Sequence, residues 1–182
     1  MVLGKLKGSN FERVICKRLS LWVSNNKRDD IFWRTHSSGG RYTIRQKIGL
    51  ETYNQAGDIT NIHPDGDFLL DKFIFELKSY KKINIWDFFK TESKNSLIKD
   101  WWIKLLQECD NNNKIPLLIV KEDYKPILFL TSSLFGNFLE KHLNFEIKII
   151  WKSNQNVNIG LFDDLLNINI DLFKNKIKEG IQ

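Results

Sequence analysis

The chain has 182 residues with a formal net charge of +6, and 42% of its residues are hydrophobic, as in an ordinary globular protein with one core. No apolar run approaches the roughly 20 residues that a membrane span needs, and no secretory signal is evident at the start. Cys16 and Cys109 have no partner at zinc-ligand spacing. We therefore expect reduced thiols, a cytoplasmic or otherwise intracellular location, and one domain over residues 1–182.

The positive charge is concentrated in the first part of the chain. Residues 1–50 contain eleven Lys or Arg and three acidic residues, a net charge of +8. Such a segment attracts polyanions and can neutralise phosphates. A solvated surface that only keeps a protein in solution can carry the same charge, so charge alone identifies no ligand.

Apolar residues at spacings of three and four predict an amphipathic helix over residues 9–25. Ser9 is a candidate N-cap, and Glu12 completes a possible capping box. A polar, basic loop is expected over residues 37–55, and a turn over residues 63–66. Short strands are expected at residues 31–35, 58–60, 67–70 and 72–80.

The second half of the chain alternates between helical and strand-like segments. Helices are expected at residues 85–91, 96–110, 132–142 and, in most of their length, 161–179. Strands are expected at residues 115–121, 126–130 and 145–152. The order α-β-(loop)-β-β-α-α-β-β-α-β-α predicts an α/β fold with a mixed sheet flanked by helices.

The strand at residues 72–80 carries the most informative pattern. Successive side chains of a strand point to opposite faces. One face takes Phe73, Phe75 and Leu77, and the other takes Ile74, Glu76 and Lys78. If the strand that begins at Asp58 pairs with this one, two carboxylates meet beside a lysine. Magnesium takes one or two carboxylates and keeps several waters, and a bound metal can polarise a phosphate and activate water. An exposed ion pair on a half-solvated strand is the alternative.

Gly57-Asp58 followed by Glu76-Leu77-Lys78 resembles the signature of the PD-(D/E)XK nuclease superfamily, with Gly57 where the motif name has Pro. The resemblance implies a Mg²⁺ site, in which Mn²⁺ substitutes, formed by Asp58, Glu76 and the main-chain carbonyl of Leu77. It also implies that Lys78 positions a water or stabilises the transition state.

Two further segments are similar to Holliday-junction-resolvase-like and phage-encoded members of the superfamily. Residues 8–13 resemble a helix-opening segment whose glutamate, here Glu12, adds a metal contact. Residues 34–39 resemble a serine- and glycine-containing loop before the catalytic Asp. The resemblance covers about residues 5–130 and implies a restriction-endonuclease-like α-β-β-β-α-β core, which leaves residues 131–182 as a C-terminal α/β extension.

Several other residues are candidates for the site. His36 is more typical of a surface residue than of a general base, and Gln107 resembles a helix glutamine that anchors the site in some members. Trp101 and Trp102 are expected to pack in the core or an interface rather than to stack on bases. Contacts to the DNA backbone, which position DNA without reading sequence, are expected from Arg34, Ser37, Ser38, Arg41, Arg45 and Lys47.

The sequence thus predicts a metal-dependent endonuclease acting on DNA, with branched DNA such as a Holliday junction as a candidate substrate, and no membrane or small-molecule partner. A homodimer is expected because paired cuts need two sites, which two-fold symmetry supplies. Three alternatives stay open: a restriction-type or nicking nuclease on linear duplex, an inactive nucleic-acid-binding subunit of the same fold, and an RNA-processing nuclease.

Overall fold

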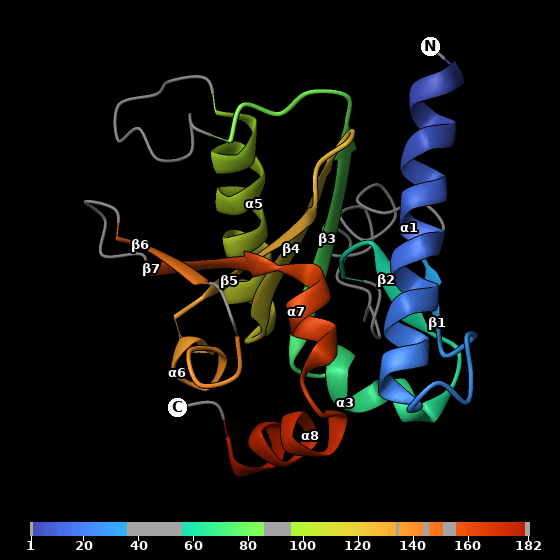
Figure 1. The fold of residues 1–182 in the computed structure, drawn as a ribbon, viewed down its shortest axis with the longest axis vertical. Coiled ribbons are helices and arrows are strands. Elements are labelled where there is room, and N and C mark those ends of the chain that lie inside the picture. Colours follow the sequence, from blue (N-terminus) through green and yellow to red (C-terminus); the bar gives the residue numbers. More distant parts are fainter. Residues whose placement is uncertain are drawn as a thin grey trace.

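A five-stranded mixed sheet in the order β3-β4-β5-β7-β6 forms the centre of the protein (Figure 1). β3 and β4 are parallel, and the other neighbours are antiparallel. The strands are β3 (Phe73–Tyr80), β4 (Ile115–Glu122), β5 (Ile127–Ser132), β6 (Glu146–Ile150) and β7 (Asn156–Leu161). This computed structural model describes residues 2–35, 56–85, 96–133, 135–143, 146–150 and 156–180. The predicted α/β fold, a mixed sheet flanked by helices in the manner of restriction endonucleases, is confirmed.

Helices pack on both faces of this sheet. On one face, α5 (Leu97–Asn112) buries Trp102 and Leu105 in a cluster with Ile74 of β3. The opposite face carries a larger cluster, in which Phe73 and Phe75 of β3 pack with residues from most of the other helices. These helices are α1 (Val2–Val23), α3 (Asp67–Leu70), α7 (Phe162–Asn167) and α8 (Ile170–Glu179), while the short α6 (Gly136–Leu139) contributes its last residue. None of the helices in the described part of the chain has both the length and the apolar character that crossing a bilayer takes.

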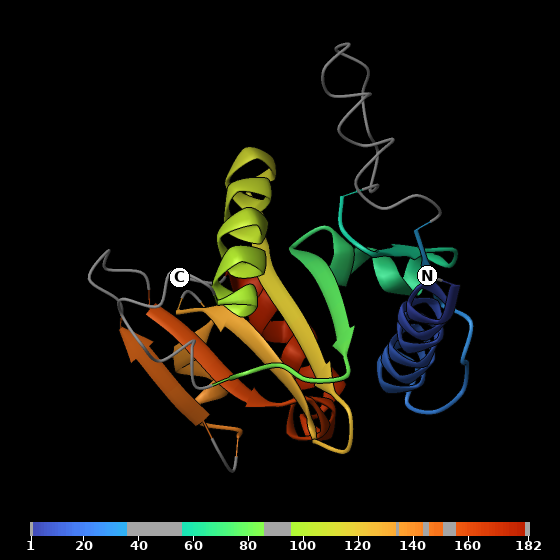
Figure 2. The same ribbon diagram turned by 90° about the horizontal axis from the view of Figure 1, so that it is seen from above.

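A two-stranded sheet lies beside β3, next to α1 (Figure 2). It consists of β1 (Phe32–Arg34) and β2 (Ile59–Asn61), which are antiparallel. The buried Ser20 of α1 anchors β1, because its Oγ accepts hydrogen bonds from the amides of Ile31 (3.0 Å) and Phe32 (2.9 Å). The pairing considered for the strand that begins at Asp58 is not the one found, since β2 pairs with β1. Asp58 itself still bonds to β3 through its amide, so its carboxylate comes to lie beside Glu76 and Lys78.

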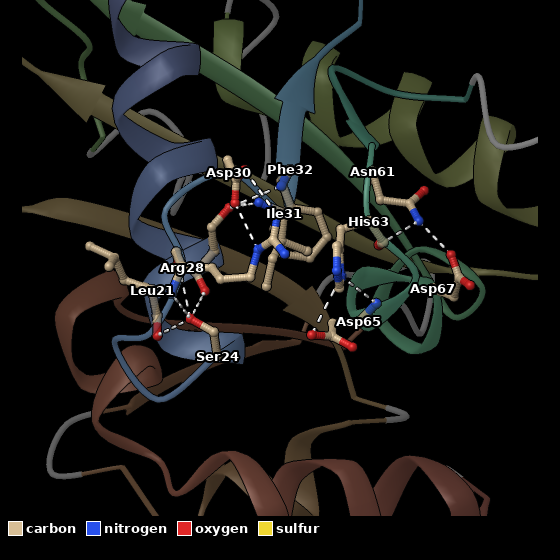
Figure 3. Close-up of polar contacts among 11 residues, drawn as sticks. Leu21, Ser24, Arg28, Asp30, Ile31, Phe32, Asn61, His63, Asp65 and Asp67 are labelled. Atoms are coloured by element: carbon tan, nitrogen blue, oxygen red, sulfur yellow. Dashed lines mark hydrogen bonds and ion pairs between the residues drawn. The ribbon is translucent and has the colours of Figure 1, made fainter.

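The turns at the far ends of β1 and β2 are held by local polar contacts (Figure 3). The Arg28 guanidinium donates to both carboxylate oxygens of Asp30, at 2.9 and 3.0 Å. Ser24 Oγ accepts from the Arg28 amide at 2.9 Å, and the His63 ring accepts from the Asp65 amide at 3.3 Å. These contacts join residues just before β1 and just after β2.

Two predicted elements in the first half of the chain are wrong in detail. The first helix begins at Val2, so Ser9 lies inside it and is not an N-cap, and Glu12 belongs to no capping box. The segment Asp67–Leu70 is a helical turn rather than a strand, preceded by the 3-10 turn Pro64–Gly66. A strand would point Leu69 and Leu70 to opposite faces, whereas the helical turn buries both in one cluster.

The C-terminal third contains a strand that the sequence reading did not predict. β7 lies between β5 and β6 and is buried at Val157 and Ile159. A Cβ on Gly160 would lie 2.6 Å from the ring of Phe129, so glycine gives that ring its space in the sheet. The predicted helix at residues 161–179 begins only at Phe162 and is interrupted before α8. The predicted helix at residues 85–91 lies almost entirely outside the described residues.

Candidate active site

Asp58 joins the two sheets. Its amide donates to the Phe75 carbonyl at 2.8 Å, and its own carbonyl accepts from the Thr35 amide at 2.9 Å. Its side chain, only 6% exposed, accepts a hydrogen bond from the Leu77 amide at 2.8 Å. The carboxylate is therefore held against β3 by the main chain on which Glu76 and Lys78 stand.

Gly57 makes this arrangement possible. Its φ of +82° lies in the left-handed region that favours glycine, and an added Cβ would lie 2.5 Å from the Phe75 carbonyl oxygen. Its amide donates to Glu108 Oε1 of α5 at 3.3 Å. A proline here could neither donate that hydrogen bond nor adopt this φ. The departure from the motif name thus has a structural reason in this chain.

Glu76 and Lys78 lie on the β3 face that carries the site and form an ion pair with each other. Burial raises the pKa of Glu76 to about 7, and the charge of Asp58 adds to the rise, while Lys78 opposes it. For Lys78, burial lowers the pKa, but the charge and hydrogen bond of Glu76 outweigh burial and raise it. The attraction of the Lys78 ammonium is thus too weak to offset the cost of burying an ionised Glu76 beside Asp58.

One pocket of about 380 Å³ contains these groups. One side of it is lined by Gly57 and Asp58, together with Glu76, Lys78 and Tyr80 of β3. Side chains two residues apart on a strand point to the same face, so β3 presents a carboxylate, an ammonium and a phenol in a row. We call this cavity the site pocket.

The other side of the site pocket is one face of α5. Trp101, Lys104, Leu105 and Glu108 line it, at the spacings of three and four that place helix residues side by side. Glu108 has a raised pKa, because burial and the charge of Asp58 outweigh its hydrogen bond from Gly57. Sequence reasoning missed this residue, and the helical spacing from Trp101 was the signal that could have found it.

Glu12 and Arg34 lie at the margin of the site. Arg34 Nη1 is 3.7 Å from Glu12 Oε2, and neither residue lines the site pocket. Burial raises the pKa of Glu12, and the charge of Asp58 raises it further, whereas Arg34 and Lys78 lower it. The structure therefore brings Glu12 into the electrostatic surroundings of Asp58, and it places the predicted DNA contact Arg34 against a carboxylate.

The remaining predicted residues divide into three groups. Trp102 is in the core as expected, at 1% exposure, whereas its neighbour Trp101 reaches the site pocket. Gln107 is exposed and does not line the site pocket, since its helix position points away from it. Outside the described residues lie His36, Ser37, Ser38, Arg41, Arg45 and Lys47.

The donor set of the site pocket fits a hard divalent cation. Asp58, Glu76 and Glu108 bring carboxylates to one cavity, and burial, with the charges of Asp58 and Glu108 adding to it, raises the pKa of Glu76. Magnesium needs only one or two of them, because waters complete its coordination. Within the described ranges, no group of three or more His, Cys, Asp or Glu side chains is arranged to hold an ion by itself.

A Gly-Asp turn fixed to a strand that carries Glu-x-Lys, in a mixed sheet flanked by helices, defines a nuclease of the PD-(D/E)XK type. A family model described as "Phage putative PDDEXK endonuclease" matches residues 4–180, and the chain belongs to this family. The match includes the C-terminal third, for which the sequence reading had found no counterpart. No match was found among curated proteins or among solved structures.

Proposed function

We propose that this protein is a Mg²⁺-dependent endonuclease that hydrolyses phosphodiester bonds of DNA at the site pocket. One observation carries the proposal: Asp58, Glu76 and Lys78 line a single cavity in a chain that belongs to an endonuclease family. Two carboxylates and an ammonium are the groups that metal-assisted hydrolysis of a phosphodiester requires. Manganese is expected to substitute for magnesium.

Each residue has a distinct part in this proposal. Asp58 and Glu76, with the carbonyl of Leu77, would hold the cation, and Glu12 would add a carboxylate from α1 at the margin. When bound, the cation polarises the scissile phosphate and lowers the pKa of a coordinated water. Lys78 stabilises the additional negative charge of the transition state, because its ammonium is held in the site pocket by Glu76.

We further propose that branched DNA, including Holliday junctions, is the substrate, and that a homodimer acts on it in the cytoplasm of the cell in which the protein is made. Contacts to the DNA backbone are proposed for Arg34 and for Ser37, Ser38, Arg41, Arg45 and Lys47.

The chain is proposed to act as one nuclease domain, and residues from Phe11 to Ile177 share one hydrophobic cluster. A restriction-type or nicking activity on linear duplex is the competing function.

The test is cleavage of plasmid, linear and four-way-junction DNA by wild-type protein and by Asp58→Asn and Lys78→Ala. Asparagine removes the metal-binding charge at nearly constant volume and can still accept from the Leu77 amide, so Asp58→Asn should fold and not cut. Lys78→Ala should bind DNA but lose most turnover, since the ammonium acts on the transition state. Mg²⁺ or Mn²⁺ should support cutting, whereas Ca²⁺ should support binding only.

Four outcomes would contradict this assignment. Full activity in EDTA would exclude the metal mechanism. Wild-type rates in either variant would exclude the roles of Asp58 and Lys78. Binding without cleavage under every metal condition would favour an inactive nucleic-acid-binding subunit, and cleavage of RNA in place of DNA would favour an RNA-processing nuclease.

A further inference from the structure

Tyr80 and Trp101 form an aromatic wall at the side of the site pocket, between the end of β3 and α5. Their ring centroids are 5.0 Å apart and their planes are inclined by 38°. Both rings line the site pocket, and Tyr80 is 42% exposed although it is a large aromatic residue. Trp101 rests on the core at one side, whereas the next residue, Trp102, is fully in the core. Core packing thus explains why Trp102 is a tryptophan, whereas the two rings of the aromatic wall face a cavity.

The position of the aromatic wall follows from strand geometry. Lys78 and Tyr80 point to the same face of β3, and two residues of a strand advance by about 6.6 Å. The phenol ring therefore stands one strand period beyond the ammonium that faces the scissile phosphate in the proposed mechanism. A group bound at the aromatic wall is a direct neighbour of the reacting phosphate.

The charges around the aromatic wall indicate which ligand it fits. Lys104 follows Trp101 by three residues on α5, so the two side chains share a helix face, and Lys104 is exposed at the site pocket. Because β3 and β4 are parallel, the connecting helix α5 runs antiparallel to β3, with Trp101 beside Tyr80 and Glu108 near Gly57. Lys104 therefore lies on the same side of the aromatic wall as Lys78, toward the carboxylates of the site pocket. A flat apolar surface next to two positive charges complements a nucleotide, in which a flat base adjoins a phosphate.

Building on the proposed nuclease function, we propose that the aromatic wall binds an unpaired nucleobase next to the scissile phosphate, while Lys104 joins Lys78 in contacting the phosphate backbone on the site side of that base. A base in an intact duplex is stacked between its neighbours and reaches a protein pocket only after it is unstacked. The aromatic wall therefore makes the site selective for DNA with an unpaired nucleotide at the cleavage position, as at flaps, gaps and branch points where a base pair has opened. Loss of one stacking ring should weaken that binding by about 5- to 150-fold.

The test measures binding without cleavage, in EDTA. Two labelled duplexes differ in one position, where a fluorescent purine analogue is either paired or unpaired, and its emission falls when it stacks on an aromatic ring. Wild-type protein should bind the unpaired form more tightly and quench it. Trp101→Leu and Tyr80→Leu should lose the quenching and about tenfold in affinity for the unpaired form, with less than about a twofold change for the paired form. Trp33→Leu is the matched control, because Trp33 is 45% exposed on β1 and lies outside the site pocket.

The outcomes separate this inference from the function on which it rests. If Trp101→Leu and Tyr80→Leu weaken binding of both duplexes equally, or of neither, the aromatic wall does not bind an unpaired base. Cleavage by the wild-type protein would still support the nuclease function in that case. Tyr80→Leu alone decides the question if Trp101→Leu does not fold, because Tyr80 is largely outside the core. A wild-type protein that neither binds nor cuts DNA would overturn both. Lys104→Gln should reduce the slope of log affinity against log salt concentration by about 1, the value for the loss of one phosphate contact.

Discussion

Replacing Glu76 by glutamine should stabilise the metal-free protein while it abolishes cleavage. Glu76 is only 23% exposed at its side chain, and its pKa rises from 4.5 to about 7 through burial and the charge of Asp58. A carboxyl group whose pKa is raised by folding contributes its full stability below about pH 4.5 and loses it as the pH rises through about 7. Because each pKa unit corresponds to about 1.4 kcal/mol, the ionised group costs about 3 kcal/mol at about pH 8.

Glutamine removes this cost, because it cannot ionise. It also removes the carboxylate partner of Lys78, which offsets part of the gain, so we expect the free energy of unfolding to rise by about 1 to 3 kcal/mol at about pH 8. For a chain of this size, that corresponds to an increase in Tm of about 2 to 12 °C. The difference between variant and wild type should vanish toward about pH 4.5.

Magnesium should reverse the order of stability. A ligand at about 1,000 times its Kd stabilises the folded state by about 4.1 kcal/mol, which exceeds the gain of about 1 to 3 kcal/mol expected for Glu76→Gln, and only the wild type keeps both carboxylates. The assay is thermal and urea unfolding at about pH 5 and about pH 8, in EDTA and in Mg²⁺. Glu179→Gln, at the exposed end of α8, is the matched control and should change little. A Glu76→Gln protein less stable than wild type in EDTA at the higher pH, or stabilised equally by Mg²⁺, would refute the reasoning.

Two further predictions concern the turn before Asp58 and the assembly. Gly57→Ala should cost about 1 to 3 kcal/mol of stability through its positive φ, or more because the added Cβ would meet the Phe75 carbonyl. It should also abolish cleavage, because it displaces Asp58. The control is Gly8→Ala, in open space on α1, which should gain about 0.5 to 1 kcal/mol. Equal unfolding curves for the two variants would contradict the described turn. Light scattering should give about twice the chain mass of 21.5 kDa, and salt should weaken DNA binding without splitting the dimer. A monomer that still makes paired cuts would refute the dimer, and one that only nicks would favour the nickase alternative.

The sequence by itself predicted the elements whose pattern is local. Alternation in β3 places Phe73 and Phe75 on one face and Glu76 and Lys78 on the other, because successive side chains of a strand point to opposite faces. The mixed sheet with helices on both faces followed in the same way from the order of apolar segments. Errors arose where local pattern and packing disagree, as at Ser9, where the helix continues upstream to Val2, and at β7, whose glycine and asparagines obscure a strand that neighbouring strands stabilise.

Only the tertiary structure decided how the site is assembled. The hydrogen bond from Leu77 to Asp58 spans 19 positions and that from Gly57 to Glu108 spans 51, so neither has a local signal in the sequence. Packing α5 against β3 selects which residues of that helix meet the carboxylates, and it turns Glu108 toward them and Gln107 away. The same packing sends Trp102 into the core and Trp101 to the site pocket. Which face of a helix becomes functional depends on what the helix packs against, and the sequence of the helix alone does not contain that information.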